Sequence, residues 1–191
     1  MGGVLSRPVL TTTRLRLEPL THAHADAVSE LDGDLEVMRF ITGRARSPQE
    51  VLADWVPMMV RDVGPGGALG YWVGSTIATE PAFVGWWCLT PDPDDPAAAE
   101  LGYRLRRELW GQGYAAEGAR ALLGHGFDTI GLDHLWAQTM AVNTRSRSVL
   151  TGIGLRPERT WVAEWNDPIP GWEQGEVGYG LSRAEWEDRK T

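Results

Sequence analysis

Two glycines stand one residue apart in the stretch WGQGYAAE, residues 110–117, directly before a run with helical spacing. A glycine-rich turn at a helix start presents unpaired backbone N–H groups and the positive end of the helix dipole, which suit a phosphate or pyrophosphate. Because glycine has no side chain, a ligand can approach this backbone closely. The alternative is that Gly111 and Gly113 only adopt positive φ in a strand-to-helix turn, which explains one glycine better than two.

Two nucleotide-binding motifs can be compared with this turn. The Gly-Lys-Ser/Thr ending of a P-loop is absent, so no lysine is placed to contact phosphates. Gly111, Gly113 and Ala116 do satisfy the dinucleotide pattern G-x-G-x-x-A, with Asp133 about 20 residues further on. In that fold, however, the glycines directly follow an early apolar strand, whereas here RLRREL intervenes and most predicted strands come earlier. A nicotinamide dinucleotide is therefore the weaker alternative.

The positions of the histidines and of the single cysteine predict neither a metal site nor a disulfide bond. His22 and His24 lie early in the chain, and His125 and His134 lie far from them, so no metal site is expected. Cys88 is the only cysteine, which excludes a disulfide within one chain. Its apolar neighbours predict a small buried hydrophobic residue.

The elements that position the glycine turn follow from hydrophobic periodicity and turn residues. Strand-like runs occupy residues 14–20, 68–78, 82–90, 98–105, 134–142, 159–165 and 173–182. Helix-like runs occupy residues 21–34, 47–66, 114–130, 143–153 and a charged tail from 183 onwards. Ser47, with Glu50 three residues later, is the expected N-cap of the second run and Asn143 that of the fourth, and Pro57 should kink or split the second. The run at 134–142 is apolar on both faces, which predicts a central strand covered on both sides. We expect an α/β (α+β) fold with a mixed, mostly antiparallel sheet of about seven strands and helices on both faces.

Length and charge limit the function classes. The 191 residues suit a single domain, 1–191, with a core at about 11–182 and a short charged C-terminal tail. The net charge of -8 argues against nucleic acid or an anionic membrane as partner and tolerates a cationic small substrate. No run is apolar for long enough to cross a bilayer, and the opening MGGVLSRP lacks the apolar core of a secretory signal. A cytoplasmic protein is expected.

The order of these features along the chain indicates a protein family more specifically than any single feature does. Strand AELGYRL, turn WGQGYAAE, a helix, a strand, NTRSRSVLTGIGL and two closing strands together resemble the GNAT superfamily of acyl-CoA-dependent N-acyltransferases. Within it, the chain is most similar to the ribosomal-protein N-terminal acetyltransferase branch. The pyrophosphate loop of that family, Q/R-x-x-G-x-G/A, is matched at Trp110, Gly113 and Ala115, with an aromatic residue in the first position.

A second motif of the family lies at the matching separation. N-x-x-S, followed after a short helix by Gly and an aromatic or apolar residue, is matched at Asn143, Ser146, Gly154 and Leu155. The resemblance covers nearly the whole chain, and its specific part is residues 100–155.

The resemblance implies acetyl-CoA as the acyl donor and no metal. The pyrophosphate would lie on the amides of residues 111–115, and the pantetheine would run along the strand at residues 103–105, splayed from its neighbour near Asn143. The residues so implied in cofactor binding are Tyr103, Arg104, Leu105, Trp110, Gly111, Gln112, Gly113, Tyr114, Ala115 and Asn143.

The implied reaction is direct attack of a primary amine on a thioester in a ternary complex, in which positioning and a backbone N–H at the oxyanion do most of the work. The ammonium proton must be removed, and Glu100 is the candidate base, since partial burial raises a carboxyl pKa toward neutrality. The alternative is a solvated residue at a strand end. Many family members use a Tyr on the short helix as acid, but Leu150 stands there, so Ser146 or water must serve. Ser146 alone would be a first-turn polar residue.

The acceptor is expected to be a small-molecule amine or a protein N-terminus. Neither its identity nor the acyl chain length follows from the sequence. The edges of the terminal strands and the Trp-rich residues 161–172 suggest a homodimer. The alternative function is a non-catalytic acyl-CoA-binding sensor or interaction module.

Overall fold

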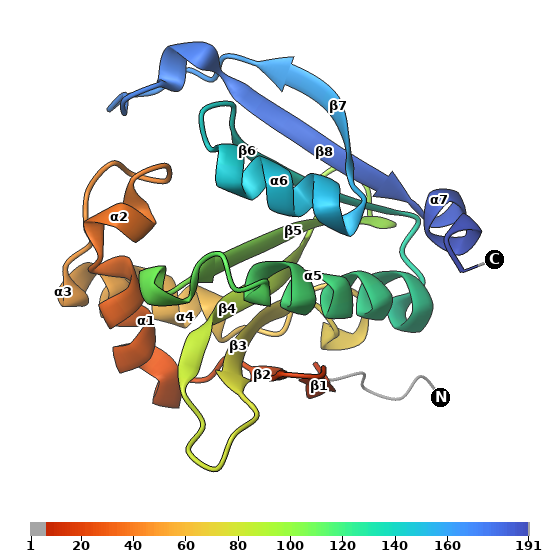
Figure 1. The fold of residues 1–191 in the computed structure, drawn as a ribbon, viewed down its shortest axis with the longest axis horizontal. Coiled ribbons are helices and arrows are strands. Elements are labelled where there is room, and N and C mark those ends of the chain that lie inside the picture. The colour runs from red at the N-terminus through yellow and green to blue at the C-terminus, as the bar shows by residue number, and fades with distance from the viewer. Residues whose placement is uncertain (1–6, 191) are drawn as a thin grey trace.

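The computed structural model describes residues 7–190, so the opening of the chain and Thr191 lie outside it (Figure 1). Its centre is one eight-stranded sheet in the order β1-β2-β3-β4-β5-β6-β8-β7. The strands are β1 Leu10–Thr11, β2 Leu15–Pro19, β3 Gly70–Thr76, β4 Phe83–Pro91, β5 Ala98–Leu105, β6 His134–Met140, β7 Arg156–Trp161 and β8 Glu176–Ser182. Among the strands formed by residues 7–190, only the β5–β6 pair is parallel.

The mixed, mostly antiparallel sheet is confirmed, with eight strands rather than about seven. The additional strand is β1, whose two residues pair with Leu17 and Arg16 of β2. Two residues are too few for an alternating pattern, so periodicity could not predict it. The predicted strand at 159–165 begins earlier, as β7, because its pairing with β8 starts at Arg156 and Gly180.

Helices lie on both faces of the sheet. They are α1 Ala25–Asp32, α2 Leu35–Met38, α3 Pro48–Glu50, α4 Val56–Met59, α5 Tyr114–Gly124, α6 Thr144–Ile153 and α7 Arg183–Asp188. Short 3₁₀ segments occupy His22–His24, Pro65–Gly67, Arg107–Leu109 and Trp172–Gln174, and π-helical turns occupy Val51–Trp55 and His125–Ile130. Ser47 caps α3 and forms a capping box with Glu50, as predicted. The predicted helix 47–66 is divided near Pro57, as expected, by the π-helical turn Val51–Trp55, and its last helical segment ends at Met59.

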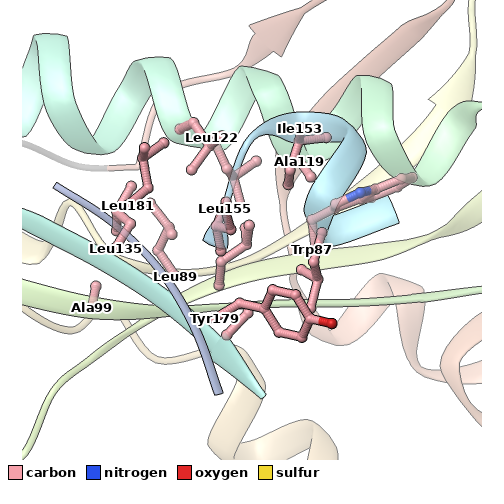
Figure 2. Packing of buried hydrophobic residues seen from close by; sticks show 14 of the residues in the cluster. Trp87, Leu89, Ala99, Ala119, Leu122, Leu135, Ile153, Leu155, Tyr179 and Leu181 are labelled. Carbon is pink, nitrogen blue, oxygen red and sulfur yellow. The ribbon is translucent and has the colours of Figure 1, made fainter. Parts of the chain in front are cut away.

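Two buried clusters join the helices to the sheet. Trp87 belongs to the cluster under α5 and α6, whereas Trp86 belongs to the cluster under α1 and the following helices. Figure 2 shows the first cluster, in which Trp87 and Leu89 lie near Ala119 and Leu122 of α5. Adjacent residues of a strand point to opposite faces, so this pair of tryptophans joins both helical layers to β4.

The prediction that residues 134–142 are covered on both faces is wrong. In β6, Leu135 and Ala137 are buried under α5 and α6, but Gln138 is exposed on the other face. The cluster under α1 draws its strand residues from β3 and β4 and none from β6. The first helices therefore cover only part of the sheet and leave one face of β6 open.

Candidate active site

The parallel pair β5–β6 opens into a wedge. Residues 98–100 of β5 pair with residues 134–136 of β6, and the last pair is Glu100 with Trp136. Beyond it, residues 101–105 have no strand partner on that side within residues 7–190. We call this space between the diverging strands the wedge.

The backbone of β5 is oriented to use the wedge. At the two ends of the strand, Arg106 N–H donates to Val84 O at 3.0 Å, and Asp92 N–H donates to Ala98 O at 3.1 Å. With the regular register between them, this means that even-numbered residues of β5 bond to β4. The N–H and C=O groups of odd-numbered residues such as Tyr103 therefore face the wedge, where an extended ligand can pair with them.

The glycine turn lies between this strand and α5. Gly111 has φ 75° and Gly113 has φ 84°, so both adopt the left-handed conformation that favours glycine. Gly113 is the N-cap of α5 and supplies no side-chain hydrogen bond, which leaves the first-turn N–H groups of the helix without a side-chain cap. A side chain on Gly111 would meet nothing within 4 Å. The glycine turn therefore connects β5 tightly to α5 and leaves backbone N–H groups to which an anion can bind.

Charged side chains from the residues before β2 and from α6 lie beside the turn. The carboxylate of Glu117 binds Arg14 at 2.6 Å and accepts a hydrogen bond from Thr12 Oγ1 at 2.6 Å. Arg14 also donates to Gln112 O at 2.9 Å, and Arg145 lies 5.3 Å from the ring centroid of Trp110. The two arginines were missed in the sequence, since no local motif connects them with the turn and only the tertiary fold brings them there.

The helix α6 borders the wedge on the side of α5. Asn143 caps α6 by accepting a hydrogen bond from Ser146 N at 3.2 Å, as expected. The Tyr103 hydroxyl lies 3.1 Å from Ser146 Oγ, and burial raises the pKa of Tyr103 to about 12. Leu150 is a buried core residue. A hydrogen bond between the hydroxyl groups of Tyr103 and Ser146 therefore connects β5 to α6.

Glu100 lies at the vertex of the wedge, on the opposite face of the sheet. Ala99 and Leu101 are in the core under α5 and α6, so the intervening Glu100 points to the side of α1. It is half-buried, and burial raises the pKa of its carboxyl group above 4.5, with a further increase from the charge of Asp92. A hydrogen bond from Gln138 acts in the opposite direction. These are the surroundings that suit a base.

Arg104 departs from the predicted site. Its side chain forms an ion pair with Asp32 of α1 on the face away from α5 and α6, so only its backbone belongs to the strand beside the wedge. Trp110 lies at the turn, and its indole N–H donates to Leu105 O at 2.9 Å. The structure thus brings the turn, the wedge and α6 together, with Glu100 at the vertex and the Arg104 side chain elsewhere.

Besides the wedge, a metal-binding cluster or a surface cavity could form a functional site. Among residues 7–190, no group of three or more His, Cys, Asp or Glu side chains is arranged to hold a metal ion. A surface cavity of about 500 Å³ lies by Leu20, Val60 and Arg7, away from the wedge. The charge of Arg7 is paired with Asp62 at 2.7 Å, so this residue offers the cavity no free cation. The candidate active site is therefore the wedge beside β5.

An extended ligand along β5, phosphates at an uncapped helix start and a carboxylate at the vertex together suit acyl transfer from a nucleotide-linked thioester. The family model described as acetyltransferase (GNAT) domain matches residues 14–156, and the chain belongs to this family. It is an N-acetyltransferase.

Relatives and solved structures agree with this assignment. The chain is 38% identical over 193 residues to the FsC-acetyl coenzyme A-N(2)-transacetylase of Aspergillus fumigatus, covering 96% of this chain and 80% of the relative. A spermidine N-acetyltransferase from Vibrio cholerae, solved with CoA and spermine, has a TM-score of 0.76 at 15% identity, covering 92% of this chain and 99% of that one. The ribosomal-protein-S5-alanine acetyltransferase from Vibrio fischeri has a TM-score of 0.75 at 15% identity, covering 94% and 98%. The predicted GNAT fold is confirmed.

No helix within the described residues has the length and apolar character needed to cross a membrane.

Proposed function

We propose that this protein transfers the acetyl group of acetyl-CoA to a primary amine by direct attack in a ternary complex. The observation that carries the proposal is the wedge, because it places an unpaired strand backbone beside an uncapped helix start on one side and Glu100 on the other. When bound, acetyl-CoA supplies the activated acetyl group as a thioester.

The residues of the turn fit a pyrophosphate. The open space at Gly111 and the uncapped first turn of α5 leave N–H groups accessible at residues 111–115, and Arg145 adds positive charge nearby, whereas the charge of Arg14 is paired with Glu117. The wedge-facing backbone groups of Tyr103 and the N–H of Leu105 would hold the pantetheine, since Leu105 O already accepts from Trp110. Trp110, Gln112, Tyr114 and Asn143 would complete this binding surface.

Proton transfer is assigned to two side chains. Glu100 would accept the proton of the acceptor ammonium, directly or through a water, since its raised pKa brings it closer to neutral pH. Ser146 Oγ–H would donate its proton to the departing sulfur and take one back from water, so that no alkoxide remains, or a water would protonate the sulfur directly. The hydrogen-bonded partner of Ser146, Tyr103, would orient the serine hydroxyl.

For the acceptor, the names of the relatives favour an amine on a small molecule. The Aspergillus fumigatus relative is named for transfer to an N(2) position, and the Vibrio cholerae neighbour for spermidine. A protein N-terminus is the second candidate, because of the ribosomal-protein acetyltransferase among the structural neighbours. A cytoplasmic location and a homodimer stay predictions.

Calorimetric titration with acetyl-CoA, followed by mass spectrometry of a panel of amines, tests the proposal. We expect saturable binding and a mass increase of one acetyl group on at least one primary amine. The absence of binding at millimolar acetyl-CoA would refute it. Binding without transfer to any small amine or N-terminal peptide would refute the assigned chemistry.

A further inference from the structure

A buried cluster of three charged side chains joins α1 to β5. Asp32 binds Arg46 at 2.7 Å through one carboxylate oxygen and Arg104 through the other. The exposed fractions of Asp32, Arg46 and Arg104 are 1%, 7% and 9%. One carboxylate faces two guanidinium groups, so this site carries a surplus positive charge that is costly to bury.

Two buried hydrogen-bond donors beside this cluster have no acceptor. Among the described residues, neither Arg104 Nε nor Trp86 Nε1 has a hydrogen-bond partner. The two residues are opposite each other on β5 and β4, and the Arg104 guanidinium carbon lies 4.8 Å from the Trp86 ring centroid. Native structures rarely leave buried donors unpaired. An acceptor at this position would satisfy both donors, and an anionic acceptor would also offset the surplus positive charge.

The cluster lies on the same sheet face as Glu100. Side chains at positions 100, 102 and 104 of β5 share that face, and Glu100 and Arg104 are four positions apart along the strand, which corresponds to about 13 Å. Gly102 lies between them, and a Cβ there would lie 2.8 Å from Cys88 Sγ. Glu100, Gly102 and the neighbouring Tyr71 are half-buried, so this face is partly exposed near Glu100, whereas the donor atoms Arg104 Nε and Trp86 Nε1 are themselves buried.

We propose that the acceptor is an elongated amine bearing a carboxylate, with the carboxylate bound at Arg104 Nε and Trp86 Nε1 and the amine at Glu100. The proposal rests on the proposed function and narrows its substrate class. Because the two positions are far apart along the strand, ω-amino acids with several methylene groups fit better than α-amino acids, whose amine and carboxylate are separated by one carbon.

The test compares ω-aminocarboxylates of increasing length with their methyl esters, using acetyl-CoA at saturation. In the wild-type protein, kcat/KM for the best carboxylate should exceed that of its ester by about tenfold or more, as for a hydrogen bond to a charged group. Trp86→Phe retains an aromatic ring but removes the unpaired N–H. This variant should lose about tenfold in kcat/KM for the carboxylate and leave the ester unchanged.

Trp72→Phe is the matched control. Trp72 is also buried, but its indole N–H already donates to Pro8 O at 2.8 Å. Trp72→Phe should lower the melting temperature and leave the carboxylate preference unchanged. Trp86→Phe should melt closer to the wild type, because its N–H has no bond to lose.

The results distinguish this inference from the proposed function. Equal kcat/KM for carboxylates and esters, or an equal loss for both in Trp86→Phe, would overturn the carboxylate site while acetyl transfer stands. If no amine is acetylated, calorimetry with the ω-aminocarboxylates decides. Binding that Trp86→Phe abolishes would support the carboxylate site without the chemistry, and no binding to the wild type would refute it.

Discussion

Glu100, which we propose as the base, combines a position at the vertex of the wedge with a carboxyl pKa that burial raises. Its strand neighbours are core residues of one face, while its own carboxylate lies on the other face at the vertex of the wedge. Burial raises its pKa above 4.5, which suits a base and makes the ionised form less favourable in the folded protein.

Glu100→Gln should lower turnover at neutral pH, and the deficit should shrink as pH rises, because the amine then loses its proton without help. A pH profile of kcat/KM measures this. An unchanged profile would remove Glu100 from the mechanism. Glu176→Gln is the matched control, since Glu176 is half-buried with a pKa raised by burial but lies on β8.

The same substitution should raise stability at neutral pH. The folded-state pKa of Glu100 lies above its unfolded value near 4.5, so its favourable contribution exists below that value and is lost as pH rises through the folded pKa. Glu100→Gln should therefore melt at a higher temperature at pH 7, with the gain disappearing below about pH 4.5. A gain that persists in acid would contradict this account.

Gln138 provides a second probe of Glu100. Its hydrogen bond favours the ionised carboxylate, so Gln138→Leu should raise the pKa of Glu100 further. The acid limb of the kcat/KM profile should then move to higher pH, with the plateau preserved. Gln49→Leu changes an exposed glutamine of α3 and should leave the profile in place. A shift in the opposite direction would refute the role of the hydrogen bond.

At the scale of elements, the position of the first turn of α5 beside the wedge depends on close packing of α5 against β4. The indole N–H of Trp87 donates to Ala115 O at 3.1 Å, and any side chain on Gly118 would overlap the Trp87 ring. Gly74 of β3 meets the same ring from another side. Glycine on both neighbours lets a tryptophan fill the space between sheet and helix.

Gly118→Ala should destabilise the fold by about 1–3 kcal/mol, because an added methyl group in a packed core forces shifts in its neighbours. Denaturant unfolding measures the change. Gly152→Ala in α6 is the control, since a side chain there meets nothing within 4 Å, and it should be neutral or slightly stabilising. Equal effects of the two substitutions would contradict the packing argument.

Gly113→Ala should weaken acetyl-CoA binding more than it weakens acceptor binding. Alanine at φ 84° is strained by about 1–2 kcal/mol, and the first turn of α5 would relax away from its present position. Calorimetry with CoA and KM values for both substrates measure the effect. If KM for the acceptor rises equally while CoA binding is retained, the turn is structural only.

At the scale of the whole molecule, one sheet with a core on each face predicts a single domain. The clusters share β3 and β4, and α7 joins the C-terminal end to α6 through a hydrogen bond from Arg189 to Ile153 O at 3.1 Å. Thermal unfolding should therefore show one transition by both far- and near-UV circular dichroism. Acetyl-CoA at 100 times its Kd should stabilise the fold by about 2.7 kcal/mol. Two separate transitions would contradict the single-domain prediction.

Local chemistry determined what the sequence alone could predict. Hydrophobic periodicity, apolar runs and turn residues predicted β2 to β6 and β8, the Ser47–Glu50 pair predicted the start of α3, and Asn143 predicted the start of α6. The glycine pair predicted a turn with positive φ, and its order relative to N-x-x-S indicated the family. All of these signals come from residues close together in the chain.

Only the tertiary structure decided where the strands separate and what each side chain meets across the sheet. The divergence after Glu100 depends on pairing between residues 36 positions apart, as the register of Glu100 with Trp136 requires. Arg104 turns toward Asp32, 72 positions away, rather than toward the glycine turn at residues 110–113. Such contacts arise from packing of distant elements, which local periodicity does not encode.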